Sequence, residues 1–178
     1  MSYRLTSPQF RIEQWNLNGN ADGLIRGNDG TWTGESYSTT PWGSQAADFD
    51  GTDDKIAVGD VYNGIKSVSF FVNPDTTTEQ FMELASGIDV DVTAGTIGTT
   101  GWTSPTVYVD GALSSALIAD YWQHVVVASA TGINANAVNF GVETTNFGDC
   151  SLALIKFYAC ELSLDEAIKL GHMGRRGL

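Results

Sequence analysis

Residues 47–58 read Ala-Asp-Phe-Asp-Gly-Thr-Asp-Asp-Lys-Ile-Ala-Val, and they constrain the fold more than any other part of the chain. Asp50-Gly51 offers the positive-φ residues that a tight turn needs. Phe49 before the turn, and Ile56 and Val58 after it, have the period-2 spacing of inward-facing strand residues. The stretch therefore predicts a hairpin, with Phe49 packed inward at the end of its first strand.

The composition agrees with an all-β fold. The chain has 178 residues, which is the size of one ordinary domain. Hydrophobic residues make up 42% and charged residues 17%, a globular rather than a disordered balance. With 20 glycines and only 4 prolines, set among Thr, Val and aromatic residues, the chain favours strands joined by many turns.

Further strands follow from alternation along the chain. Val68, Phe70 and Val72 share one face of a strand at residues 67–73, and Asp110-Gly111 predicts a second hairpin. Residues 152–158 are apolar on both faces, so we expect a central, covered strand. The other predicted segments are short edge strands at 3–5 and 10–12, a surface loop at 35–45, and strands at 80–85, 88–92, 121–127 and 138–142.

One helix is predicted near the C-terminus. Ser163 and Glu166 have the spacing of a capping box, in which each side chain satisfies a free backbone N–H of the other. Leu164, Ala167 and Ile168 form its predicted apolar face, and Gly171 is expected to end the helix. Leu162 is placed to staple its first turn.

Several motifs in this order resemble the laminin-G-like jellyroll group of the concanavalin A-like lectin/glucanase superfamily. The first is the Phe-Asp-Gly-x-Asp-Asp signature at residues 49–54, and the second is the Val-Asp-Gly hairpin at 109–111. The third is a Trp-containing strand at 121–127, and the fourth is a closing Tyr-x-x-x-Leu-Ser-x-x-Glu at 158–166. The resemblance implies an antiparallel two-sheet jellyroll β-sandwich with one short C-terminal helix. We expect an N-terminal arm or edge strand at 1–14, the jellyroll domain at 15–171 and a tail at 172–178.

No catalytic constellation is apparent. Glycoside hydrolases with this fold carry a strand with the motif Glu-x-Asp-x-x-Glu, and the chain has no such triplet. Retaining chemistry needs two carboxyls about 5 Å apart. Asp89 and Asp91 share a strand face and are expected to be solvated, and Glu79 and Glu83 lack strand-pair spacing. His124 is expected to be a packed, hydrogen-bonded side chain, and His172 lies in the tail. We predict no enzyme activity and no catalytic or cofactor-binding residues.

The resemblance also raises metal binding, because many members of the group hold a structural calcium. Asp22, Asn28 and Asp29 are the candidate ligands in the N-terminal loops. However, the carboxylates that the group often carries in its final strand are replaced here by residues 152–154. Asp50, Asp53 and Asp54 are interpreted as turn-fixing residues. We therefore predict no metal or other cofactor, with structural calcium as the alternative.

Glycan binding is the remaining option for a site. Lectins stack an exposed aromatic side chain on the apolar face of a sugar. Trp32, Tyr37, Trp42 and Trp102 lie in predicted loops rich in Asn, Asp and Gly. For each one taken singly, the favoured interpretation is that it covers an end of the core. No specific sugar site is assigned.

Charge and cysteine content limit the partners and the setting. The net charge of −12 disfavours nucleic acid, and no apolar run approaches a membrane span. Cys150 and Cys160 flank one predicted strand and would lie about 30 Å apart, beyond the ~7 Å limit for a disulfide. Two free thiols are therefore expected, and residues 1–8 lack the apolar core of a secretory signal, so we expect synthesis in a cytoplasm.

Together these features predict a non-catalytic structural or recognition module. The setting that fits them is a virion surface, as a bacteriophage capsid decoration, head-fibre or tail-associated protein. It would be a homo-oligomer, anchored to a capsid or other virion protein through residues 1–13, with host cell-surface glycans as a further partner. The alternative is a carbohydrate-binding, lectin-like domain of an extracellular protein.

Overall fold

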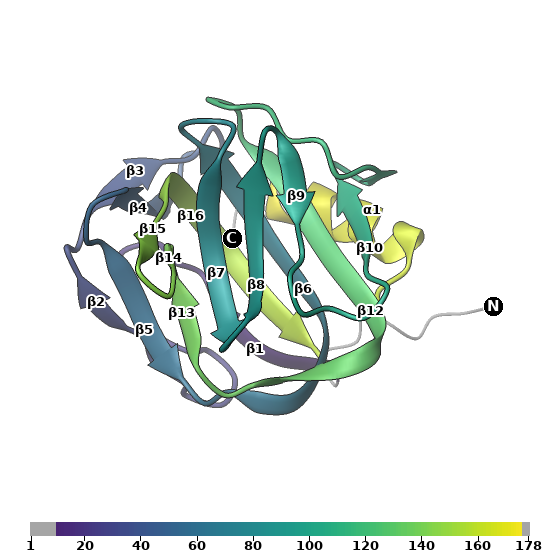
Figure 1. Ribbon diagram of the computed structural model, residues 1–178. Coiled ribbons are helices and arrows are strands. Elements are labelled where there is room, and N and C mark those ends of the chain that lie inside the picture. The colour runs from purple at the N-terminus through teal and green to yellow at the C-terminus, as the bar shows by residue number, and fades with distance from the viewer. Residues whose placement is uncertain (1–9, 176–178) are drawn as a thin grey trace.

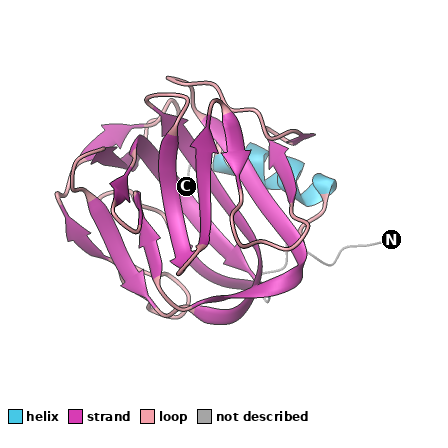
Figure 2. Cartoon of the chain, in the orientation of Figure 1, coloured by secondary structure: helices cyan, strands magenta, loops and turns pink. Residues whose placement is uncertain are grey.

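Two antiparallel β-sheets stacked face to face form the body of the protein, as the computed structural model shows (Figure 1). The structure describes residues 10–175, so the predicted strand at 3–5 lies outside the described residues. Strands dominate the chain, and one helix lies near its C-terminal end (Figure 2). The predicted all-β, two-sheet jellyroll sandwich with one short C-terminal helix is confirmed.

Sheet A has eight strands in the order β11-β10-β12-β6-β16-β4-β3, and β1 pairs with β16 beside this path. Its strands are β1 (Arg11–Trp15), β3 (Tyr37–Thr39), β4 (Gln45–Asp50), β6 (Tyr62–Pro74), β10 (Thr106–Val109), β11 (Ala112–Leu113), β12 (Gln123–Ala135) and β16 (Asp149–Tyr158). The predicted loop at 35–45 thus contains a short strand, β3, and the predicted strand at 121–127 begins only at Gln123.

Sheet B has six strands in the order β2-β5-β13-β7-β8-β9. They are β2 (Thr31–Thr33), β5 (Lys55–Gly59), β7 (Glu79–Ala85), β8 (Ile88–Thr93), β9 (Thr96–Gly98) and β13 (Val138–Phe140). A small separate hairpin of β14 (Val142–Glu143) and β15 (Asn146–Phe147) lies against β7. In Figure 1 sheet B faces the viewer and sheet A lies behind it.

The main core fills the space between the two sheets. The predicted inward face of β6 is confirmed, because Val68, Phe70 and Val72 are fully buried. Trp15 of β1 packs edge-on against Phe140 of sheet B, with ring centroids 5.1 Å apart. Aromatic side chains from both sheets therefore meet across the interior and fix how the sheets stack.

The first predicted hairpin is not one. Phe49 and Ile56 do point inward and are buried, and Asp50-Gly51 does turn the chain, with Gly51 at φ +70°. However, β4 pairs with β3 and β16 in sheet A, whereas β5 pairs with β2 and β13 in sheet B. The turn is an arch that carries the chain from sheet A to sheet B. Phe49 of β4 therefore points toward sheet B across the core, and Ile56 of β5 points toward sheet A.

The second predicted hairpin is confirmed. Tyr108 pairs with Leu113 and Val109 with Ala112, so β10 and β11 are joined by a two-residue turn. Both turn residues have positive φ, 50° at Asp110 and 75° at Gly111, as a type I′ turn requires.

Strand β16 is the central strand that the sequence predicts. It pairs with β1, β4 and β6, and its residues from Cys150 to Tyr158 are all buried. A bulge between Ala153 and Lys156 is centred on Leu154, which has φ +52°. The bulge turns Leu154 toward the outer face of sheet A, where it packs with Phe71 and Ala153.

Helix α1 (Leu164–Gly174) covers part of that outer face, on the side away from sheet B (Figure 1). The Glu166 carboxylate accepts hydrogen bonds from the Ser163 N–H and hydroxyl, both at 2.8 Å. The predicted capping box between Ser163 and Glu166 is therefore present. The packed residues of the helix are Ala167 and Leu170, whereas the predicted contact residues Leu164 and Ile168 are exposed. The predicted face is therefore confirmed at Ala167 and wrong at Leu164 and Ile168, because the position of the helix on sheet A determines which side chains are covered.

Gly171 does not end the helix, which continues to Gly174. A Cβ at Gly171 would lie 3.1 Å from Nδ1 of His124, so this glycine serves a close helix–sheet approach rather than a C-cap. The helix thus runs past the predicted domain limit at 171, and β1 crosses the predicted limit at 14/15. Residues 11–13 of the predicted anchoring arm are part of sheet A, with Ile12 and Glu13 buried.

Two further observations concern the chain as a whole. Cys150 and Cys160 are both free and lie at opposite ends of β16, as predicted. Within the described residues, no helix combines the length and the apolar character needed to span a bilayer.

Candidate functional site

An open pocket of about 450 Å³ lies at the outer side of sheet A, next to the C-terminal end of α1. Its volume is within the range of small-molecule binding sites. Three separate segments supply the lining: the turn between β3 and β4, the loop before β12, and the residue that follows α1. The lining residues are Pro41, Trp42, Asp120, Tyr121, Trp122 and Arg175.

A tight turn between β3 and β4 presents Trp42. The backbone N–H of Thr40 donates to the carbonyl of Ser44 at 2.9 Å, and the N–H of Ser44 donates to the Thr40 hydroxyl at 3.0 Å. Gly43, at φ +89°, supplies the left-handed residue inside this loop. Pro41 and Trp42 therefore project from a turn whose ends are locked by paired hydrogen bonds.

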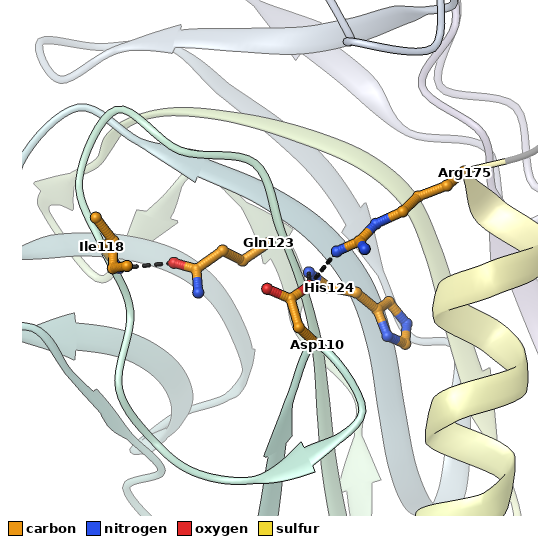
Figure 3. A network of polar contacts seen from close by, with 5 residues as sticks. All are labelled: Asp110, Ile118, Gln123, His124 and Arg175. Atoms are coloured by element: carbon orange, nitrogen blue, oxygen red, sulfur yellow. Dashed lines mark hydrogen bonds and ion pairs between the residues drawn. The ribbon is translucent and has the colours of Figure 1, made fainter.

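The loop before β12 presents the other aromatic residues and is held by two hydrogen bonds to neighbouring segments. The buried side chain of Gln123 accepts a hydrogen bond from the backbone N–H of Ile118 at 2.6 Å (Figure 3). The N–H of Asp120 donates to the carbonyl of Pro74 at 2.8 Å. These contacts hold Tyr121 and Trp122 in place at the start of the strand.

The aromatic side chains form a corner rather than a flat platform. The Trp42 and Trp122 rings lie 5.6 Å apart with an angle of 68° between their planes. Trp42 also packs edge-on against Phe71 of sheet A, at 4.9 Å, which anchors it to the sandwich. Tyr121 is 59% exposed, so one ring of the pocket is open to solvent. A corner of this kind suits a ligand that stacks on one ring and contacts the edge of another.

The charged groups of the pocket come from two different segments of the chain. Asp120 is exposed, and Arg175 reaches from the end of α1 to the carboxylate of Asp110 in the β10–β11 turn (Figure 3). The same Asp110 oxygen accepts a hydrogen bond from the N–H of His124 at 3.0 Å. Because both partners of the ion pair are partly exposed, it contributes little to stability, but it fixes where the guanidinium lies.

His124 lies beneath α1 and does not reach the pocket. Its side chain is buried, its Nε2 lies 2.9 Å from the Ser69 hydroxyl, and its ring packs against Phe71. Burial, reinforced by the positive charges of Lys156 and Arg175, lowers the pKa of His124 to about 3. The packed, hydrogen-bonded role expected from the sequence is confirmed.

Of the four loop aromatics singled out in the sequence, one lines the pocket. Trp102 is a core residue whose Nε1 donates to the carbonyl of Asp89, and Trp32 stacks on Phe49 and packs against Tyr37. Only Trp42 contributes to the pocket. Tyr121 and Trp122 were missed because they were assigned to a strand. Two adjacent bulky aromatics after an Asp cannot both face inward from a strand, and that was the available signal.

The strand carboxylates differ from the expectation at one position. Asp89 was expected to be solvated, but it is buried, because the segment around Thr100 folds over it and accepts a hydrogen bond from its backbone N–H. This burial, with the nearby charge of Glu143, raises the pKa of Asp89. Asp91 is half-buried, and Glu83 lies opposite Asp89 in the β7–β8 register. None of these carboxylates lines the aromatic pocket.

The candidate calcium ligands in the N-terminal loop are used for local structure. An oxygen of Asp29 accepts a hydrogen bond from the N–H of Gly23 at 3.0 Å, and the side chain of Asn28 donates to the carbonyl of Asp60. The loop is organised by Glu13, which the sequence reading overlooked. This buried carboxylate accepts from the N–H groups of residues 25 and 26 at 2.7 and 2.9 Å.

One cluster of three acidic residues in the described part of the chain brings potential cation ligands close together. Oxygens of Asp50, Asp53 and Asp54 lie within 4.8 Å of one another, so these residues could hold a hard cation. Asp50 also accepts a hydrogen bond from the N–H of Thr52 at 2.8 Å, which is the turn-fixing role predicted for it. Burial, followed by the charge of Asp50, raises the pKa of Asp54.

No protein-family model matches the chain, and no curated protein matches it by sequence. Among solved structures, it is similar to domain 4 of AbnA, a GH43 extracellular arabinanase from Geobacillus stearothermophilus, solved in complex with arabinotriose. The TM-score is 0.64 at 16% identity, over 91% of this chain and 98% of that domain.

Two other groups of structures share the fold over only part of their length. The binding domain of Paraclostridial Mosquitocidal Protein 1 has a TM-score of 0.63 at 11% identity, over 93% of this chain and 52% of that one. A Trypanosoma rangeli sialidase mutant has a TM-score of 0.64 at 9% identity, over 97% of this chain and 34% of that one. These likenesses establish the β-sandwich fold.

Proposed function

We propose that this domain is a non-catalytic recognition module that binds saccharides in the pocket between Trp42 and Trp122. The observation that carries the proposal is the pocket itself, in which two tryptophans and an exposed tyrosine are joined by one carboxylate and one guanidinium. Aromatic rings stack on the apolar faces of sugars, while a carboxylate and a guanidinium accept from and donate to their hydroxyls.

The structural likeness to a known domain supports the proposal of saccharide binding. Domain 4 of the arabinanase has this fold over nearly its whole length and was solved with an oligosaccharide bound. The absence of catalysis is part of the proposal: the pocket lining holds a single carboxylate, and His124 is buried under the helix. Paired carboxyls are needed for the usual glycoside hydrolysis. Turnover of any oligosaccharide by the pure protein would contradict this part.

The test is glycan-array screening followed by calorimetry on pocket variants. Because Tyr121 is largely exposed, Tyr121→Ala leaves the core intact, and we expect it to weaken binding by roughly tenfold. Trp122→Ala is expected to abolish measurable binding. Ile118→Ala, in the same loop, exposed and outside the pocket lining, is the matched control and should bind normally. Equal affinities for Trp122→Ala and the wild type would refute the site.

The finer assignments remain proposals that rest on the sequence. We propose that the chain belongs to the laminin-G-like group, which its ordered motifs support. We also propose that it is a virion surface protein displayed on a capsid as a homo-oligomer, which its acidity and free thiols support. The extracellular lectin-like domain is the alternative setting. Co-sedimentation with purified particles supports the virion setting, whereas a strict monomer that is absent from every particle fraction would exclude it.

A further inference from the structure

The described lining gives the pocket a negative charge balance although it contains an arginine. Among the residues that the structure describes, Arg175 is the one cation that lines the pocket, and its guanidinium is already paired with Asp110. Asp120 also lines the pocket and has no ion pair with any described residue. The net effect of the three groups is one negative charge, on a protein whose overall charge is −12. An anionic ligand therefore meets an occupied arginine and an uncompensated carboxylate.

An uncharged sugar meets no such cost. The Asp120 carboxylate only accepts hydrogen bonds, so it suits the donor hydroxyls of a sugar diol. Arg175 has five N–H donors, of which Asp110 engages those on one nitrogen, so others remain for hydroxyl or ring oxygens of a ligand. The same two groups thus complement a neutral polyol while opposing a carboxylate or sulfate.

Asp110 is built into the turn in a way that keeps its charge beside Arg175. Its positive φ is the one that the β10–β11 turn requires, and its carboxylate is also fixed by the N–H of His124. Arg175 follows the last residue of α1 and lies between the pocket and a smaller hollow of about 30 Å³ that Asp110, Ile168, Gly171 and His172 also line. The ion pair therefore spans from the turn to the helix end at the border of the pocket.

We propose that the pocket selects uncharged saccharides over acidic ones, and that Asp110 sets this selectivity by neutralising Arg175. The inference rests on the proposed function and adds the ligand class to it. Asp110 is a positioning residue in this account, because it acts on the ligand through Arg175 and does not line the main pocket itself.

The informative variant is Asp110→Asn. Asparagine tolerates the left-handed conformation of the turn and keeps an oxygen that can accept the His124 N–H, so the substitution removes charge with little change in shape. Asp165→Asn is the matched control, because it makes the same change in net charge on the exposed first turn of α1. Asp120→Asn tests the second carboxylate.

The measurement is calorimetry at low salt with matched neutral and acidic probes, lactose against 3′-sialyllactose and xylotriose against its glucuronyl derivative. We expect the wild type to prefer the neutral member of whichever pair it binds by about fivefold or more, and Asp110→Asn to gain roughly threefold for the acidic member. Asp165→Asn should leave the ratio unchanged, and added salt should reduce the difference.

Each outcome decides between the two proposals. A wild type that prefers the acidic probes, or equal ratios for Asp110→Asn and Asp165→Asn, overturns the selectivity while leaving saccharide binding standing. If no glycan binds, or if Trp122→Ala binds like the wild type, the proposed function fails and the inference fails with it.

Discussion

His124 shows how a single titratable residue can be buried next to a binding pocket without taking part in it. Its ring fills the space between Phe71 and Gly171 of the closely packed helix. Among the described residues, the one hydrogen-bond partner of the ring is Ser69. Since no anion among residues 10–175 stabilises the charged form of the ring, burial keeps the imidazole neutral. The residue therefore contributes to packing under α1. Because its ring is buried in the neutral form, we expect the stability of the protein to depend on pH.

The pKa of His124 is lowered to about 3 in the folded protein, against 6.5 for the ordinary side chain. The unfolded chain thus binds the proton first, and stability conferred by neutral His124 is lost as the pH falls below 6.5. Between pH 7.5 and pH 5 the wild type should lose about 2 kcal/mol more unfolding free energy than His124→Gln. Urea unfolding of both proteins at the two pH values measures this.

The comparison with the variant is needed because other groups act in the opposite direction. Burial raises the pKa of Asp54, Asp89 and Asp149, so their contribution to stability grows as the pH falls. These carboxylates are present in both proteins and cancel in the difference. Parallel pH curves for the wild type and His124→Gln would show that His124 is not desolvated as described.

At the scale of elements, the C-terminal end of α1 is held against sheet A by a glycine. A Cβ at Gly174 would lie 2.2 Å from Cε2 of Phe71 and 3.3 Å from Leu154. Gly174→Ala should therefore lift the last turn and cost about 1–3 kcal/mol of stability, measured as a shift in the urea midpoint. Because Arg175 follows directly, saccharide affinity should fall as well.

The control for this prediction is Lys169→Ala, an exposed position of the same helix whose replacement has no packing consequence. It should leave both the midpoint and the affinity within error of the wild type. If Gly174→Ala unfolds at the wild-type midpoint, the helix end is not packed on Phe71, and the account of how Arg175 is positioned fails.

The elements themselves were largely predictable, whereas their pairing was less so. Alternation identified the buried face of β6, apolar residues on both faces identified β16 as a covered strand, and Asp110-Gly111 identified a true hairpin. The same Asp-Gly chemistry at residues 50–51 joins two different sheets, because inward-facing side chains on both sides of a turn fit an arch as well as a hairpin. The local pattern records which side chains are buried, and only long-range strand pairing decides which sheet they enter.

The candidate site was the least predictable part for the same reason. Its lining comes from three segments that are distant in sequence, and Trp42 was the one lining residue that the sequence singled out. Tyr121, Trp122 and Arg175 come together only because α1 packs on the outer face of sheet A next to β12. The corner between the two indole rings is a property of the fold and has no local signature.

At the scale of the whole molecule, the protein has one interior between the sheets and a second, smaller apolar layer under α1. The first layer contains Cys150, whereas Cys160 belongs to the second, together with Leu162, Ala167 and Leu170. Separation of the sheets exposes the first layer, and undocking of the helix alone exposes the second. The two thiols thus report on different unfolding events of the same chain.

Thiol labelling in increasing urea should separate these events. In Cys160→Ser, the remaining Cys150 is buried in the main core, and burial raises the pKa of its thiol well above the usual value, so the native state should not react. Its labelling should require global unfolding, with an opening free energy and urea dependence equal to those from circular dichroism. In Cys150→Ser, the half-buried Cys160 should label faster and with a weaker urea dependence, because detaching α1 exposes less surface. A Cys150 that labels as readily as Cys160 would mean that the end of β16 opens without the rest, and that the two sheets do not unfold as one cooperative unit.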